Sequence, residues 1–265
     1  MAELHPQLKN IRFSDRVIQI TDSIGNACTL VTGSKKAILF DTMAGPCDLK
    51  SYVSTLTDLP LTVVCSHGHF DHISGSWQFE EVWLNPLEIP VYEQSKADMR
   101  TVLKPMNVPL PDSLKEGAPQ PLFPELKEGM TFDLGGLTAE AVSLPGHTAG
   151  SMGLLLKEER MVLVGDAASP QMCLLFPESE PVEVYLKTLD KLEALPADRI
   201  VGSHFLKTFP MEAVNVFRKC TDVIGKGRPM KYTFNPVPYY KGYIWFYKIN
   251  EPVTGETVAI ITPRE

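Results

Sequence analysis

The pattern of apolar and polar residues in the first quarter of the chain predicts β-strands. The segments FSDRVIQITD (residues 13–22) and NACTLVTGSKKAILFDT (residues 26–42) are rich in apolar and β-branched residues, and the polar stretch TGSKK interrupts the second. Such runs, divided by Gly and Ser, are typical of strands joined by turns in a meander. The run LPLTVVCS (residues 59–66) has the length of one more strand, and it leads directly into SHGHFDHISGS.

The middle of the chain predicts one strand, one helix and a proline-rich insertion. EVWL (residues 81–84) is expected to be a strand, and VYEQSKADMRTVLK (residues 91–104) a helix that ends before Pro105. Six prolines between residues 105 and 124 exclude a regular helix or central strand there. We expect this insertion to cover the functional site, and a linker between domains is the alternative interpretation.

The second half predicts further strands and two helices. Strands are expected on both sides of Gly135 and Gly136, and again on both sides of the turn KEER in SMGLLLKEERMVLVGD. PVEVYLKTLDKLEAL (residues 181–195) has one apolar helical face, and PMEAVNVFRKCTDVIG (residues 210–225) predicts a helix with Gly225 as its cap. Residues 230–263 read as strands with a turn at VTGE, and their aromatic residues fit a strand or a pocket wall.

Composition narrows the class of protein. A chain of 265 residues with 44% hydrophobic residues can bury one large core, and its net charge of -7 argues against nucleic-acid binding. We find neither a secretory signal nor an apolar stretch of membrane-spanning length, which favours a cytoplasmic protein without a membrane partner. The five cysteines are scattered and never form a C-x-x-C pair, so we expect reduced thiols rather than disulfides or a thiolate metal site.

Histidine and aspartate residues gather at the ends of predicted strands. Four apolar runs end in a turn with such a residue, namely LTVVCSHGHFDH, AEAVSLPGH, MVLVGD and DRIVGSH. A single histidine is more often a surface or hydrogen-bonded core residue than a ligand. Five of the six histidines occupy these ends, however, and loops at one edge of a sheet converge on a common point. The pattern therefore predicts a metal site built from imidazole and carboxylate ligands.

These motifs resemble those of the metallo-β-lactamase fold superfamily. The H-x-H-x-D-H signature is followed in order by PGHT (residues 145–148), GD (residues 165–166) and GSH (residues 202–204). The resemblance implies an α+β fold, a four-layer αβ/βα sandwich in a single domain that spans residues 1–265. It also implies two metal ions, the first held by His67, His69 and His147, the second by Asp71, His72 and His204, with Asp166 as a bridge. Zn²⁺ is favoured for a ligand set without thiolates, and Fe and Mn are the alternatives.

The resemblance implies hydrolysis of a small ester, thioester or lactone by a hydroxide that bridges the two metal ions. Asp71 is the candidate catalytic residue, which would orient the attacking water and accept its proton. We expect Asp41 to support a ligand by a hydrogen bond, and an ordinary turn-capping aspartate is the alternative. The substrate is expected to be a small molecule, and the sequence leaves the oligomeric state open.

Departures from named members of the superfamily narrow the activities that the resemblance implies. Classical β-lactamases lack an aspartate equivalent to Asp166, and homoserine lactonases carry a tyrosine where this chain has Ser169. Glyoxalase II enzymes are similar in their metal ligands but add a C-terminal helical region, whereas this chain ends in predicted strands. Three alternatives stay open: a mononuclear iron oxidoreductase of the persulfide dioxygenase type, a phosphodiesterase of the same fold, and a binding module without catalysis.

Overall fold

The N-terminal segments form a five-stranded sheet in the order β1-β2-β3-β4-β5. In this computed structural model the described residues are 8–22, 25–45, 47–106, 120–235 and 237–263. Strands β1 to β4 run antiparallel, which confirms the predicted meander. The predicted strand β5 joins β4 in parallel, a pairing that was not predicted. The strands are β1 (Lys9–Arg12), β2 (Val17–Thr21), β3 (Ala27–Thr32), β4 (Ala37–Phe40) and β5 (Leu61–Val64).

A second, six-stranded sheet has the order β12-β11-β9-β8-β7-β6. The turn at Gly135 and Gly136 joins β6 to β7, and both glycines adopt the positive φ angles that other residues rarely take. The predicted hairpin at KEER joins β8 to β9. The strands are β6 (Thr131–Asp133), β7 (Thr138–Ser143), β8 (Met152–Leu156), β9 (Met161–Gly165), β11 (Arg199–Gly202) and β12 (Thr208–Pro210).

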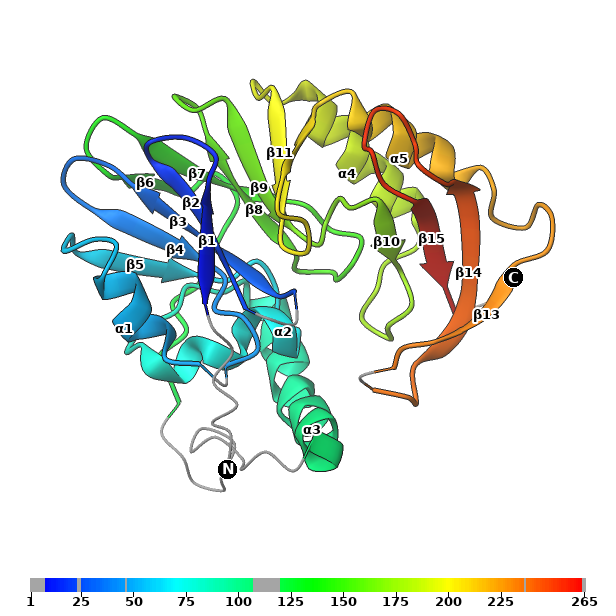
Figure 1. Cartoon of the computed structure of the whole chain (residues 1–265), viewed down its shortest axis with the longest axis horizontal. Helices are drawn as coiled ribbons and strands as arrows, with labels where there is room; N and C mark the ends of the chain where they lie inside the picture. Colours follow the sequence, from blue (N-terminus) through cyan, green and yellow to red (C-terminus); the bar gives the residue numbers. More distant parts are fainter. Residues whose placement is uncertain (1–7, 23–24, 46, 107–119, 236, 264–265) are drawn as a thin grey trace.

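The two sheets pack face to face, with helices on their outer faces (Figure 1). Val31, Phe40 and Val64 of the first sheet belong to the same buried cluster as Leu154 and Leu163 of the second. The outer face of the first sheet packs against α1 (Leu49–Ser54) and α3 (Ile89–Met106), and that of the second against α4 (Val182–Ala194) and α5 (Ala213–Thr221). The predicted α+β sandwich of four layers is confirmed.

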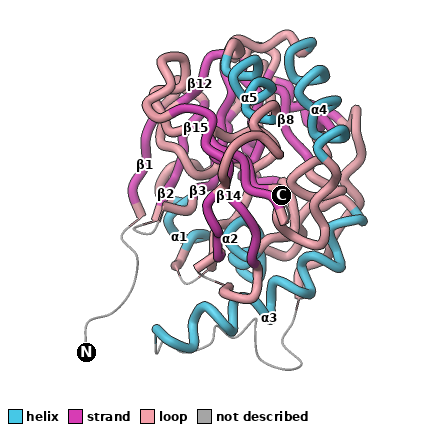
Figure 2. The backbone as a smooth tube through the Cα atoms, turned by 90° about the vertical axis from the view of Figure 1, so that its right-hand side faces the viewer, coloured by secondary structure: helices cyan, strands magenta, loops and turns pink. Residues whose placement is uncertain are grey.

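The C-terminal strands form a third sheet of four strands, in the order β10-β15-β14-β13. Trp245 and Ile260 from this sheet share a buried cluster with residues of α4 and α5. Figure 2 shows β14 in front of the sandwich and α3 below it. The strands are β10 (Gln171–Cys173), β13 (Met230–Thr233), β14 (Lys241–Lys248) and β15 (Val258–Thr262). Strands in this region were predicted, but their assembly with β10 into a separate sheet was not.

Three local predictions differ from the structure. Helix α3 continues through Pro105 to Met106, since the fixed φ of proline is compatible with a helix and only one helical residue follows it. EVWL forms single bridges to neighbouring segments rather than a strand, including one between Trp83 and Val64. Helix α5 ends at Thr221, and Gly225 lies in the turns that follow.

The described helices also bear on membrane insertion. None of those in the described part of the chain is both long and apolar enough to cross a membrane.

Candidate metal centre

The four predicted strand ends deliver their polar residues to one place. Strand β5 ends two residues before Ser66, and β9 and β11 end just before Asp166 and Ser203. The segment after β5 is more than a turn, because Phe70–Ile73 forms the short helix α2 with His69 at its N-cap. All seven residues of the predicted ligand set lie in the resulting cluster, namely His67, His69, Asp71, His72, His147, Asp166 and His204.

Three imidazoles face one another in the first group. His69 Nδ1 lies 3.1 Å from His67 Nε2 and 2.9 Å from His147 Nε2. All three residues are buried, with at most 8% of their surface exposed. Nitrogen atoms directed at a common point in this way could hold one cation.

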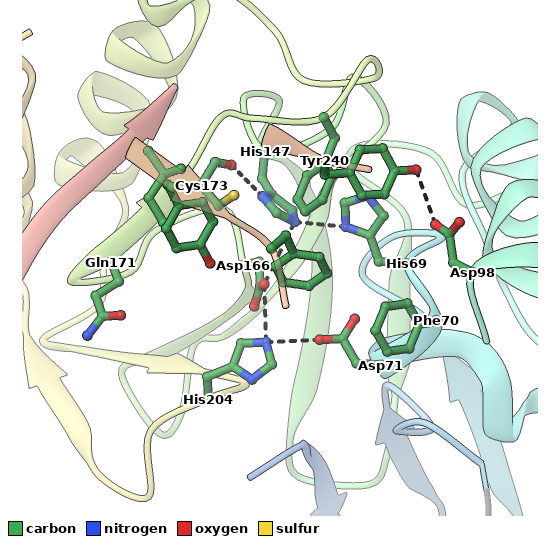
Figure 3. A pocket seen from close by; sticks show the side chains of 14 residues that line it. His69, Phe70, Asp71, Asp98, His147, Asp166, Gln171, Cys173, His204 and Tyr240 are labelled. Atoms are coloured by element: carbon green, nitrogen blue, oxygen red, sulfur yellow. Dashed lines mark hydrogen bonds and ion pairs between the residues drawn. The ribbon is translucent and has the colours of Figure 1, made fainter. Parts of the chain in front are cut away.

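A second group combines imidazoles with carboxylates. His204 Nε2 lies 3.4 Å from Asp71 Oδ2 and 3.2 Å from Asp166 Oδ2, and His72 Nε2 lies 3.5 Å from Asp166 Oδ1. Asp166 also reaches the first group, with Oδ2 3.7 Å from His147 Nε2. Figure 3 shows Asp71, Asp166 and His204 directed toward one another. Two ligand atoms of one tetrahedral zinc are about 3.3 Å apart, which is close to these separations.

The outward nitrogens of the buried imidazoles are held by hydrogen bonds. His72 Nδ1 lies 3.0 Å from Asp41 Oδ2, and His147 Nδ1 lies 2.7 Å from the carbonyl oxygen of Cys173. His69 Nε2 lies 2.6 Å from Glu178 Oε1. Acceptors at these nitrogens fix the tautomer and leave the inward nitrogen with a free lone pair.

The inward nitrogen of His72 tests whether the residues of the site fit a cation. His72 Nε2 is buried and has no hydrogen-bond partner among the described residues, with the carboxylates of Asp166 and Asp71 3.5 and 3.8 Å away. A buried nitrogen without a partner is costly unless another group satisfies it. A divalent cation between His72, Asp71 and His204 would do so, and the residues of the site therefore fit the metal that the fold implies.

The pKa values of the imidazoles differ between the two groups. Burial lowers the pKa of His147 to about 4 and also lowers the pKa of His67, so these imidazoles are neutral near pH 7. Burial also lowers the pKa of His204, but the Asp166 carboxylate outweighs it and raises the pKa to about 9. The carboxylates thus attract positive charge to the second group, where a cation can replace the bound protons.

Asp41 connects the first sheet to the cluster, as predicted. It is fully buried, and its carboxylate accepts hydrogen bonds from the backbone and hydroxyl of Ser66 at 2.7 and 3.0 Å and from the hydroxyl of Ser203 at 3.1 Å. Since the hydroxyl of Ser66 donates to Asp41, it can accept from His67 Nδ1, 2.9 Å away. Asp41 therefore positions His72 directly and His67 through Ser66, and the alternative of a turn-capping aspartate is wrong.

Glu88 is a buried carboxylate that sequence reasoning missed. Its Oε2 accepts from the backbone of Gly68 and its Oε1 from the backbone of Gly150, both at 2.8 Å. Burial raises the pKa of Glu88. A Cβ at Gly150 would lie 2.6 Å from Glu88 Oε1, so only glycine allows this approach. Glu88 thus ties the loop of His67 and His69 to the loop that follows His147.

Glu178 was also missed, because no motif surrounds it and it lies 109 residues from its partner His69. Its hydrogen bond to His69 lowers the pKa of the Glu178 carboxyl despite the opposing effect of burial. We expect Glu178→Ala to weaken metal binding about 10- to 100-fold, because His69 loses the acceptor that fixes its tautomer. Competition with a chromogenic chelator measures this affinity.

Two further variants sharpen this test. Glu178→Gln retains an acceptor oxygen, so its affinity should lie between those of Glu178→Ala and the unchanged protein. Glu183, which is exposed on α4, provides a matched control in Glu183→Ala. Equal metal affinity of the Glu178→Ala and Glu183→Ala proteins would contradict the positioning role.

A cavity of about 240 Å³ opens onto the cluster. His69, Asp71, His147, Asp166 and His204 lie at one side of it. The other walls come from Phe70 of α2, Asp98 of α3, Phe176, and the third sheet with its adjoining residues. Of the predicted aromatic group in that sheet, Tyr240 lines the cavity, Trp245 is in the core and Phe246 is exposed.

The cysteines provide no nucleophile for this cavity. Cys173 lines it, and burial raises the pKa of its thiol to about 12. Cys28, Cys47, Cys65 and Cys220 are buried, and all five thiols are free, as predicted. A neutral thiol is a poor nucleophile.

Most of the proline-rich insertion, residues 107–119, lies outside the described residues. At its described ends, Leu122 is exposed and Phe123 packs against Tyr92 with ring centroids 4.9 Å apart. Neither residue lines the cavity. That the insertion covers the site stays a prediction.

Comparison with known proteins identifies the family. The family model described as the metallo-beta-lactamase superfamily matches residues 23–204. This chain therefore belongs to the metallo-β-lactamase superfamily, a fold associated with divalent metal binding.

Named relatives are hydrolases or resemble β-lactamases. Beta-lactamase-like protein 2 homolog of Caenorhabditis elegans is 28% identical over 186 residues, which cover 68% of this chain and 55% of that protein. Acyl-coenzyme A thioesterase MBLAC2 of Homo sapiens is 25% identical over 74% of this chain and 78% of its own. A hydroxyacylglutathione hydrolase of Brucella abortus is 26% identical over 51% of this chain and 44% of its own. The predicted class, an enzyme of the hydrolase type, is confirmed.

Solved structures agree on the fold. A metallo-beta-lactamase from Pontibacter korlensis superimposes with a TM-score of 0.60 at 17% identity, covering 79% of this chain and 96% of that one. A protein solved in a di-iron-bound form gives a TM-score of 0.55 at 24% identity, covering 73% of this chain and 94% of its own.

Proposed function

We propose that this protein is a dinuclear metal-dependent hydrolase that cleaves small thioesters. In this proposal His67, His69 and His147 hold one divalent ion. Asp71, His72 and His204 hold the other, and Asp166 lies between the two. The observation that carries it is the arrangement of buried imidazoles, each with its outward nitrogen hydrogen-bonded and its inward nitrogen turned to the cluster. Zn²⁺ is favoured for nitrogen and oxygen ligands without thiolate, and Fe and Mn are the alternatives.

The reaction is hydrolysis of an acyl–sulfur bond. When bound, divalent cations supply a hydroxide near neutral pH and stabilise negative charge on the oxygen of the attacked carbonyl group. A new C–O bond forms as the C–S bond breaks, which yields a carboxylic acid and a thiol. Thioesters are the substrates named for the human and Brucella relatives, and this supports them over esters and lactones.

Asp71 has the geometry of a proton carrier. Its Oδ2 faces His204 at 3.4 Å and His72 at 3.8 Å. Its Oδ1 makes no hydrogen bond or ion pair with another described residue, and the side chain lines the cavity (Figure 3). We infer that Oδ1 accepts the proton of the attacking water and passes it to the leaving sulfur.

Metal analysis joined to a substrate panel tests the proposal. We expect two metal ions per chain by elemental analysis, and hydrolysis of thioesters at a higher kcat/KM than of phosphodiesters, amides or lactones. In the Asp166→Ala protein the content of both ions should fall, whereas Asp198→Ala, at an exposed ion pair with Arg160, should retain them. One iron per chain together with oxygen consumption would instead support the dioxygenase alternative.

A further inference from the structure

Beside the metal centre, most of the remaining wall of the cavity is apolar, with Asp98 and Gln171 as its polar residues. The apolar part is formed by Phe70, Phe176, Tyr232, Phe234, Tyr240 and Ile261. The lining residues, all from the described part of the chain, include no Lys or Arg. A group that enters this half therefore gains from apolar burial and finds no cationic side chain to pair with.

Phe176 links this wall to the metal centre. Its ring centroid lies 4.5 Å from that of His69, 5.5 Å from that of Phe234 and 5.0 Å from that of Tyr240, in edge-to-face contacts. Edge-to-face packing of this kind restricts ring motion and stabilises the arrangement. The apolar wall thus begins directly beside the clustered imidazoles.

Asp98 of α3 accepts a hydrogen bond from the Tyr240 hydroxyl, so this hydroxyl is not available to donate to a ligand. The Tyr240 hydroxyl donates to Asp98 Oδ2 at 3.1 Å, as Figure 3 shows. Asp98 Oδ1 accepts from Gln94 at 3.0 Å and from the Tyr239 hydroxyl. Burial raises the pKa of Asp98, whereas the donors at its two oxygens favour the ionised carboxylate. When ionised, Asp98 would repel an anionic ligand in the cavity.

The volume of the cavity favours a small group as its occupant. Taking about 30 Å³ for each water-sized group, the cavity of about 240 Å³ holds about eight such groups. Large thiols such as coenzyme A or glutathione exceed this size and carry several charges. This size favours the acyl group, rather than the thiol, as the part of a thioester that would occupy the cavity.

We propose that the aromatic half of this cavity is an acyl-binding site for uncharged, apolar acyl groups of up to about eight non-hydrogen atoms. The proposal rests on the thioesterase function proposed above. It predicts selection for the acyl group rather than for the thiol.

A series of thioesters of one thiol tests this selection with the metal-loaded protein. We expect kcat/KM to rise up to about fourfold for each methylene added from acetyl to hexanoyl, which is the effect of burying one methylene. It should fall again at decanoyl. Succinyl and 4-methylpentanoyl thioesters form a matched pair of similar shape, and the charged succinyl group should react at least about tenfold more slowly. A flat series, or preference for succinyl, would overturn the acyl-binding site.

Phe234 provides a test of the cavity wall. Phe234→Ala should lower kcat/KM for the hexanoyl thioester by about tenfold and raise the ratio of decanoyl to hexanoyl activity, because it removes packing and adds space. Phe246→Ala is a matched control on a neighbouring strand, since Phe246 is 45% exposed and lies outside the cavity. Identical acyl profiles of the Phe234→Ala and unchanged proteins would count against the site.

A binding measurement separates the two proposals. The probe is a non-hydrolysable ketone in which a methylene group stands between the hexanoyl carbonyl and sulfur, titrated calorimetrically into the metal-loaded protein. Tight binding that Phe234→Ala weakens, without hydrolysis of any thioester, would keep the acyl-binding site and reject the thioesterase function. Thioester hydrolysis without such binding or acyl preference would do the reverse.

Discussion

Replacing Asp71 with Asn should lower kcat for thioester hydrolysis by about 10²- to 10⁴-fold, the usual contribution of a positioned general base. The amide has nearly the shape of the carboxylate, so the cavity keeps its form, but the side chain can no longer accept the proton of water. Asp71 is only partly buried on the short helix α2, and Asp166 remains beside His72 and His204 when the charge of Asp71 is removed. We therefore expect the fold to survive.

Three measurements accompany this variant. Circular dichroism reports the fold, elemental analysis the metal content, and steady-state kinetics the change in kcat. Alkylation of the metal-loaded enzyme should leave activity intact, since burial raises the pKa of the thiol groups. If Asp71→Asn kept full kcat, or if alkylation abolished activity, proton transfer by Asp71 would have to be abandoned.

The second large effect concerns stability. Asp41→Ala should lower the free energy of unfolding by about 3–5 kcal/mol, the usual cost of breaking a buried polar network. It removes the acceptor of hydrogen bonds from the Ser66 backbone, Ser66 Oγ, Ser203 Oγ and His72 Nδ1, and all of these donors are buried. Urea unfolding of the metal-free protein measures the change.

Asp41→Asn separates stability from metal binding. Asp41 has a φ of 69°, a left-handed conformation that Asn tolerates better than most residues. Asn also keeps one acceptor oxygen, so Asp41→Asn should lower the free energy of unfolding less than Asp41→Ala does. The NH₂ group that Asp41→Asn introduces would face His72 Nδ1, which needs an acceptor. Metal affinity should therefore fall even though the loss of stability is small. Asp198→Ala is an exposed control, and unfolding energies equal to that control would refute the structural role of Asp41.

The candidate site was largely predictable because its residues follow strands directly. An apolar run predicts a strand, and the histidine or aspartate after it must lie at the edge of the sheet. His67, His147 and His204 were placed in this way. Asp41 followed from the same reasoning, since it comes directly after β4.

Glu88 and Glu178 escaped prediction for a physical reason. The partners of Glu88 are backbone N–H groups of two glycines, and sequence pattern does not reveal which backbone groups a fold leaves unpaired. Glu178 reaches His69 across a long sequence separation and belongs to no periodic segment. The assembly of the third sheet was also not predicted, because β10 pairs in parallel with β15, which is distant in the sequence.

The division of the metal centre between two sheets makes a bound cation a removable cross-link. Four of the clustered residues follow the first sheet and three follow the second. A ligand that binds only the folded state adds about 4 kcal/mol when its concentration is 1,000 times its Kd. If the proposed ions bind in this way, the supply of metal in the cell sets the lifetime of the folded chain as well as its catalytic rate, and metal starvation removes the protein as well as its activity.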